Sequence, residues 1–383
     1  TINKIGLGAF SSSGIVNLYY DAEEIVDFYG SNWVFYPQNE KDFAPEQMKQ
    51  NIHLLVGPNV KCIPSRFFFP LGTHTGLHPK VSSIEFCKDS KVTSIGEYAF
   101  YNLEDIQTVY LPSSLKTIGE YAFYNMGIKE LKLPDLVTTI GKNAFNFCDS
   151  LKNIKLSKNL EFVGESAFYG CEKLEYLDFS QTKLKTISKH SFKNCSSLTY
   201  LNLSGVEQIE ESAFENDEAL LDLSIADTVK HIGLKAFMGC ESVKSLYLGN
   251  SVEVINEYAF KDLTNLEQLF VASNDLADLV SGNNVFTNLG NNNEKGIDVI
   301  YQTGVEKIVS RMFFPHSDAS NVIHIHRLFL PTSMKEIKEF ALYGATVDSI
   351  RYQGKESNYQ VSVEGHNNEL PKPVYMEDID YVD

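Results

Sequence analysis

An eight-residue segment, IGEYAFYN, occurs twice in this chain, at residues 95–102 and again 23 residues later at 118–125. Repetition at a short fixed period is the signature of an architecture in which each copy forms one unit stacked on the next. The phenylalanine of the segment recurs at spacings of 22 to 24 residues, at Phe100, Phe123, Phe145, Phe168, Phe192, Phe214, Phe237 and Phe260. The repeat therefore predicts a solenoid.

Other repeated positions describe one coil of this solenoid. An Ile or Val precedes each phenylalanine by five residues, and the residue directly before the phenylalanine is Ala or Ser. An alternating apolar pair further upstream, such as Leu131 and Leu133, indicates a half-buried strand. Two residues after the phenylalanine most coils carry Asn, Gly or Asp, which tolerate a positive φ and mark a turn; Phe147 is the exception. Each unit is thus a strand, a turn, an apolar return and a turn.

The repeat continues in degraded form outside the central copies. Residues 60–70 and 305–315 resemble each other and carry the Ile and Phe positions of a coil, and Phe286 fits the Phe position of a stretched coil at 272–300. One unit alone buries too little apolar surface to offset the entropy of ordering it, so the coils have to stack. We expect about a dozen coils of 22–24 residues over 52–360, an N-terminal cap or insertion at 1–51, and an acidic C-terminal tail at 361–383.

The 23-residue pattern LxxLxLPxxLxxIGxxAFxxC resembles that of the BspA-like, Treponema pallidum-type leucine-rich repeat family, with Cys148, Cys171, Cys195 and Cys240 in the family's cysteine position. The resemblance implies a leucine-rich-repeat solenoid with a parallel β-sheet on one face and short turns or helical pieces on the other. It also implies a non-catalytic bacterial protein, extracellular or on the cell surface, used for adhesion and protein binding. The location rests on the resemblance alone, because this chain begins at Thr1 and we expect its true N-terminus, with any export signal, to have been removed.

Composition excludes several classes of partner. The 50 acidic and 33 basic residues give a net charge of −17, which repels nucleic acid and anionic membrane surfaces. No apolar run approaches the roughly 20 residues of a membrane span, so we expect no membrane insertion. No catalytic motif or cofactor fingerprint is present, and we expect no cofactor and a monomer. The repeated cysteines should form a ladder of small apolar side chains.

The position between the two core residues of each strand points outward from the sheet. In four consecutive coils it holds Tyr247, Phe270, Ile300 and Phe329, an apolar strip that we predict to bind a ligand. The alternative is that the loops at 272–298 or 315–326 cover it. Tyr176 and Tyr200 occupy a similar outward position in adjacent coils. They are a second candidate binding site, where they could stack on a sugar or peptide. The alternative is ordinary cross-strand packing of the two side chains.

Two further segments carry hypotheses of their own. Residues 11–51 interrupt the repeat and hold the only tryptophan, Trp33; they cap the first coil or form a binding appendage. Histidines gather in two insertions, at His74 and His78 and then at His316, His324 and His326. The second group, with Asp318, has zinc-ligand chemistry, but the simpler interpretation is an ordinary surface loop, and we expect no metal.

The sequence thus favours a non-catalytic surface or secreted protein. Its expected partner is a protein or glycan of a host or neighbouring cell, bound on the sheet face of the solenoid. One alternative is a structural spacer within a larger surface protein. Another is an enzyme accessory region with its site in residues 11–51.

Overall fold

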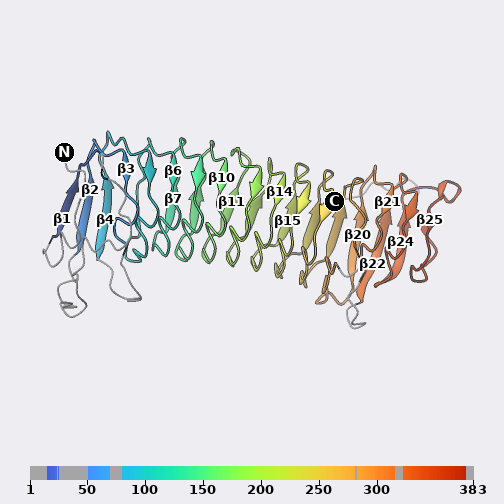
Figure 1. The fold of residues 1–383 in the computed structure, drawn as a ribbon. Helices are drawn as coiled ribbons and strands as arrows, with labels where there is room; N and C mark the ends of the chain where they lie inside the picture. Colours follow the sequence, from blue (N-terminus) through green and yellow to red (C-terminus); the bar gives the residue numbers. More distant parts are fainter. Residues whose placement is uncertain are drawn as a thin grey trace. The chain divides into compact units, whose positions relative to one another are not determined.

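The computed structural model describes residues 15–23, 25, 51–69, 80–280, 283–314 and 322–376. The chain divides into two compact units. The N-terminal unit comprises residues 1–176, 181–184 and 191–196, and the C-terminal unit comprises 177–180, 185–190 and 197–383. In the described residues the strands pair in parallel and turns connect them, with a single 3-10 helix, η3, at Glu356–Asn358 (Figure 1). The leucine-rich-repeat solenoid expected from the sequence is confirmed.

Strands of the N-terminal unit form two kinds of sheet. The first kind contains the longer strands. Strands β1 (Asn17–Tyr20), β2 (Ile52–Val56) and β4 (Val81–Phe86) pair in that order. Strand β7 (Glu130–Lys132) pairs with β9 (Asn153–Lys155), and Asn153 of β9 lies opposite Tyr176 at the start of β11 (Tyr176–Asp178). The second kind is a five-stranded sheet of two-residue strands, β3 (Cys62–Ile63), β5 (Ser94–Ile95), β6 (Thr117–Ile118), β8 (Thr139–Ile140) and β10 (Phe162–Val163). The repeated Ile or Val position therefore builds a sheet of its own.

The C-terminal unit repeats this plan. Its seven-stranded sheet contains, in order, β15 (Asp222–Ile225), β17 (Ser245–Leu248), β19 (Gln268–Val271), β20 (Ile297–Tyr301), β22 (Ile323–Leu330), β24 (Ala345–Tyr352) and β26 (Val374–Tyr375) (Figure 1). Short strands form two further sheets, β12 (Thr186–Ile187), β14 (Gln208–Ile209), β16 (His231–Ile232) and β18 (Val254–Ile255), then β21 (Lys307–Ile308), β23 (Glu336–Ile337) and β25 (Ser362–Val363). The short strand β13 spans Tyr200–Asn202.

Stacked phenylalanine rings fill the interior. The rings of Phe123, Phe145 and Phe168 lie 5.1 Å apart with interplanar angles of 8° and 6°, and all three are fully buried. The small residue before each ring lets neighbouring coils approach, so that the backbone N–H of Phe145 donates to the carbonyl of Ala167 at 2.8 Å. In the C-terminal unit Phe286 stacks on Phe260 at 5.8 Å, which confirms its predicted place in the stretched coil.

Two positions of the repeat adopt the left-handed backbone conformation in the coils from Tyr98 to Asn288. The position two after the stacked phenylalanine does so as predicted, for example Asn102 at φ 61° and Asn125 at φ 51°. Phe147 occupies the same position at φ 57°, although the conformation costs a residue with a Cβ roughly 1–2 kcal/mol. The position two before the ring is also left-handed, at Tyr98 and Tyr121 among others, which the sequence did not indicate. Backbone bonds to the next coil hold it there, as from the Tyr98 N–H to the Glu120 carbonyl at 2.9 Å.

Parallel strand pairing also occurs outside residues 52–360, at the N-terminal side of one unit and the C-terminal side of the other. Strand β1, inside the segment expected as a cap, pairs with β2 from Asn17 opposite His53 to Tyr20 opposite Val56. Strands β25 and β26 lie in the segment expected as a tail and pair with β23 and β24. Most of the rest of the predicted cap, Trp33 included, lies outside the described residues.

Candidate functional site

The four residues of the predicted strip are neighbours on the outer sheet face of the C-terminal unit. Tyr247 lies opposite Phe270, Phe270 opposite Ile300, and Ile300 opposite Phe329 in the strand registers. Core leucines such as Leu246 and Leu248 alternate with them and are fully buried. We call Tyr247, Phe270, Ile300 and Phe329 the apolar strip; it ends at Ser224 on one side and Arg351 on the other.

Only part of the apolar strip meets solvent. Ile300 is 7% exposed, and the other three side chains are half-buried. The Arg327 guanidinium lies 5.4 Å from the centre of the Phe329 ring. The Tyr247 hydroxyl donates to the Asp227 carboxylate at 3.1 Å. Burial and then the Asp227 charge raise the pKa of Tyr247, so its hydroxyl stays a hydrogen-bond donor through the physiological range.

A polar row runs parallel to the strip, two residues earlier on each strand. Gln268 lies opposite Asp298, which lies opposite Arg327. The Arg327 Nε donates to Asp298 Oδ1 at 2.8 Å and its Nη2 donates to Oδ2, a bidentate pair that holds both side chains in one geometry. Asp298 is 8% exposed, and this hydrogen bond raises the pKa of Arg327.

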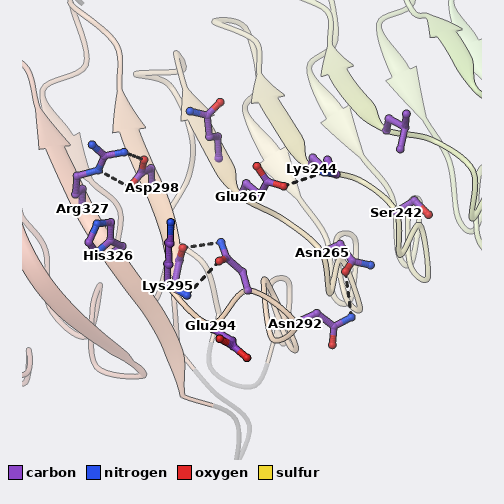
Figure 2. Close-up of a pocket in the computed structure, with 14 residues that line it drawn as sticks. Ser242, Lys244, Asn265, Glu267, Asn292, Glu294, Lys295, Asp298, His326 and Arg327 are labelled. Carbon is purple, nitrogen blue, oxygen red and sulfur yellow. Dashed lines mark hydrogen bonds and ion pairs between the residues drawn. The ribbon is translucent and has the colours of Figure 1, made fainter.

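This polar row lines a groove of about 910 Å³ (Figure 2). Lys244 and Glu267 form an ion pair of 3.1 Å along it, and Lys295 and Glu294 add one charge of each sign. The other lining residues are polar for the most part: Leu221, Ser242, Asn265, Gln268, Asn292, Asn293, Gly296, Asp298, His326 and Arg327. The groove thus offers paired charges and amides beside an apolar strip.

The stretched coil supplies one wall of the groove. The Asn292 amide donates to Thr264 Oγ1 and Asn265 Oδ1 at 3.2 Å each, and the Asn293 amide donates to the Gly296 carbonyl at 2.6 Å. Gly296 has φ 80°, and a Cβ on it would meet the His324 carbonyl oxygen at 2.7 Å. Sequence reasoning missed this wall; the extra length of the coil and its NNNEK run were the available signals.

Tyr176 and Tyr200, the second sequence candidate, belong to different units. Tyr176 is 43% exposed in the N-terminal unit and Tyr200 is 44% exposed in the C-terminal unit. Their role as a joint ligand platform stays a prediction.

The second aromatic surface is one that the sequence analysis missed. In the N-terminal unit the rings of Tyr98 and Tyr121 stack at 4.6 Å, and those of Tyr101 and Tyr124 stack at 4.7 Å. We call the whole group the aromatic face: Phe69, Tyr98, Tyr101, Tyr121, Tyr124, Phe147 and Tyr169. The two tyrosines of the repeated IGEYAFYN segment were its signal.

His324 and His326, the described histidines of the second predicted group, are engaged with a carboxylate. His324 Nε2 and His326 Nδ1 lie 2.9 and 3.3 Å from Asp348 Oδ2. Burial opposes ionisation of Asp348, but these two hydrogen bonds hold its pKa below the usual range. Among the residues described, no three His, Cys, Asp or Glu side chains are arranged to hold a metal. His74, His78, His316 and Asp318 lie outside the described residues.

The cysteines of the repeat are fully buried, as the sequence predicted. The Cys148 Sγ donates to the Phe123 carbonyl at 3.2 Å, and Cys171 and Cys240 make the same bond to Phe145 and Phe214 at 3.3 Å. Burial raises the pKa of Cys148 to about 12. The six cysteines are thiols rather than disulfides, and Cys62 and Cys87 are the partly exposed ones.

Alkylation should therefore distinguish two classes of thiol. At pH 8 we expect iodoacetamide to modify Cys62 and Cys87 while Cys148, Cys171, Cys195 and Cys240 stay intact, because buried thiols are neither ionised nor accessible. Peptide mass spectrometry on native and urea-unfolded protein measures this. Modification of the four buried cysteines at the rate of the unfolded chain would contradict the buried ladder.

Stacked parallel coils of about 23 residues around a phenylalanine column define a leucine-rich-repeat protein. The pattern of the BspA type leucine rich repeat region matches in six copies over residues 78–199 and 162–293, more than half of the chain. The chain belongs to this family. No curated protein matches it. No helix in the described part of the chain has the length and apolar character needed to cross a bilayer.

A solved structure with a TM-score above 0.5 agrees with the fold. A leucine-rich repeat protein from Bacteroides ovatus is 17% identical with a TM-score of 0.53, over 95% of this chain and 92% of that one. A leucine rich cell surface protein from Faecalibacterium prausnitzii is 19% identical with a TM-score of 0.37, over 80% and 89%. The Treponema pallidum leucine rich repeat protein is 20% identical with a TM-score of 0.33, over 52% and 77%. At 17% identity the likeness to the Bacteroides ovatus protein extends to the fold alone.

Proposed function

We propose that this chain is a non-catalytic binding protein, secreted by a bacterium or displayed on its surface, and that the outer sheet face of its C-terminal unit binds a protein ligand. The observation that supports this most is the apolar strip beside the polar groove. Membership of the BspA-type family supports the location.

A protein fits this surface better than a glycan does. The groove carries both signs of charge, on Lys244, Glu267, Glu294 and Lys295, as does the surface of most proteins. Interfaces place aromatic and apolar anchors at their centre with a polar rim, and the strip and groove have that arrangement. Because stacked coils hold every strand, little ordering entropy is lost on binding.

Charging the apolar strip tests the proposal. We expect Tyr247→Glu/Phe270→Glu to weaken ligand binding at least tenfold, because two carboxylates would have to be desolvated at the centre of the contact. A panel of immobilised host extracellular-matrix proteins, read by surface plasmon resonance, measures this after circular dichroism confirms folding.

The matched control changes the same outward strand position elsewhere. Lys132 and Lys155 lie opposite each other on β7 and β9, and Lys132→Glu/Lys155→Glu should leave binding unchanged. Binding that survives the Tyr247/Phe270 change would move the site away from the strip. Failure to bind any protein of the panel would favour a spacer instead.

A further inference from the structure

Phe147 departs from the rule that its repeat follows. It adopts φ 57° at the position where the neighbouring coils carry Asn125 and Gly170. A bulky side chain is disfavoured in this conformation. The ring is also 44% exposed, so it gains only part of the burial that could offset the strain. The Phe147 N–H donates to the Tyr169 carbonyl at 2.8 Å, the same bond to the next coil that sets this conformation at Asn125 and Gly170, so the feature peculiar to Phe147 is its exposed ring.

The ring of Phe147 completes an ordered aromatic surface. It stands perpendicular to Tyr124 and Tyr169, at centroid distances of 5.8 and 5.4 Å and angles of 88° and 86°. Tyr124 in turn stacks on Tyr101 at 4.7 Å. A parallel row contains Tyr98 and Tyr121. The aromatic face therefore presents ring edges and hydroxyls at the spacing of the coils.

Amide groups border these rings. The Asn125 amide donates to Asn102 Oδ1 at 2.5 Å and to Glu104 Oε1 at 2.8 Å. At the other end, the Asn194 amide donates to the Tyr169 hydroxyl at 3.1 Å. Amides and phenols fixed in this way can both donate to and accept from a ligand.

The charged side chains beside the rings already have partners: Glu104 accepts from the Asn125 amide, and two others form ion pairs. Arg66 lies 3.3 Å from Glu97 and 5.4 Å from the centre of the Tyr98 ring, and Lys142 lies 2.9 Å from Glu165. A charged ligand gains little from such a surface. A ligand that combines apolar C–H faces with hydroxyl groups matches both the rings and the amides.

We propose that the aromatic face binds a neutral linear glycan, with Phe147 as the principal stacking residue and about one sugar unit per coil. A pyranose ring presents C–H groups on its faces and hydroxyls around its edge. A linear chain repeats both along one direction, at a step similar to that of the coils. This site is separate from the sheet face and uses different residues.

Calorimetric titration of the full chain with cellohexaose, xylohexaose and laminarihexaose tests the proposal. A hexagalacturonate and a proline-rich decapeptide serve as the charged and peptide probes. We expect one or more neutral hexasaccharides to bind, and Phe147→Asn and Tyr124→Lys each to weaken binding at least tenfold. Lysine already occupies the Tyr124 position in other coils, at Lys193 and Lys261, so this variant should fold.

Two controls separate the aromatic face from other exposed rings of the chain. Phe162, on β10, is 51% exposed and lies opposite Thr139, so Phe162→Thr removes an exposed ring from another surface and should leave binding intact. Tyr247→Glu/Phe270→Glu should also leave glycan binding intact, whatever it does to protein binding. Phe147→Asn should keep the wild-type melting temperature or raise it, because asparagine is at ease in the left-handed conformation.

Each contrary result overturns the proposal. The proposal is wrong if none of the neutral hexasaccharides binds, or if Phe147→Asn and Tyr124→Lys bind them as tightly as the wild-type chain does. If only the decapeptide or only the hexagalacturonate binds, the proposed class of ligand is wrong. A fall in melting temperature of more than about 4 °C in Phe147→Asn gives the ring a structural role instead.

Discussion

Replacing Phe145 by alanine is expected to lower the free energy of unfolding by about 3–5 kcal/mol. Its ring is fully buried and stacks between Phe123 and Phe168 at 5.1 Å on each side. Truncation removes the transfer energy of one ring and the contacts of two others, and leaves a cavity that stacked coils cannot close without breaking their backbone bonds.

Urea unfolding followed by circular dichroism measures this loss. Phe162→Ala is the matched control, since that ring is 51% exposed and its removal should cost less than about 1 kcal/mol. Equal losses in the two variants would contradict a continuous ring stack as the main source of stability.

Gly127→Ala is expected to destabilise the chain by about 2–3 kcal/mol, through steric overlap. A Cβ at Gly127 would lie 1.9 Å from the Glu104 carbonyl oxygen, a backbone atom that cannot rotate away. The coil from Phe123 to Phe145 has 22 residues, one fewer than its neighbour, which makes the turn after Met126 tight.

Two other glycines serve as controls for Gly127 in thermal unfolding. A Cβ at Gly365 would meet nothing within 4 Å, so Gly365→Ala should have almost no effect. Gly205 also has open space but φ 91°, so Gly205→Ala should cost about 1 kcal/mol from backbone conformation alone. A Gly127→Ala effect no larger than that of Gly205→Ala would show that the backbone yields at this point.

Most of the interior was predictable because each buried position of the repeat carries the same type of residue in many successive coils. The stacked phenylalanines, the buried cysteines and the register of Tyr247, Phe270, Ile300 and Phe329 all follow from spacing alone. Even the degraded coil around Phe286 was placed correctly, because one buried ring is enough to fix its neighbours.

Features that depend on contacts between coils were missed. Tyr98 and Tyr121 carry no turn signal, yet backbone bonds to the following coil impose a positive φ on them. The groove wall at Asn292 and Asn293 arises from an insertion, where periodicity gives no information. The strands β1, β25 and β26 were not predicted because terminal coils depart from the repeat pattern.

The likeness of successive coils has an evolutionary consequence. Each coil presents to the next the same column of rings and the same carbonyls that it receives from the one before, as in the stack of Phe123, Phe145 and Phe168. One coil can therefore be duplicated or deleted, and the coils on either side of the change still have matching contact surfaces. Such a gene can lengthen or shorten its product one coil at a time, and duplication of one coil would produce identical segments such as those at 95–102 and 118–125.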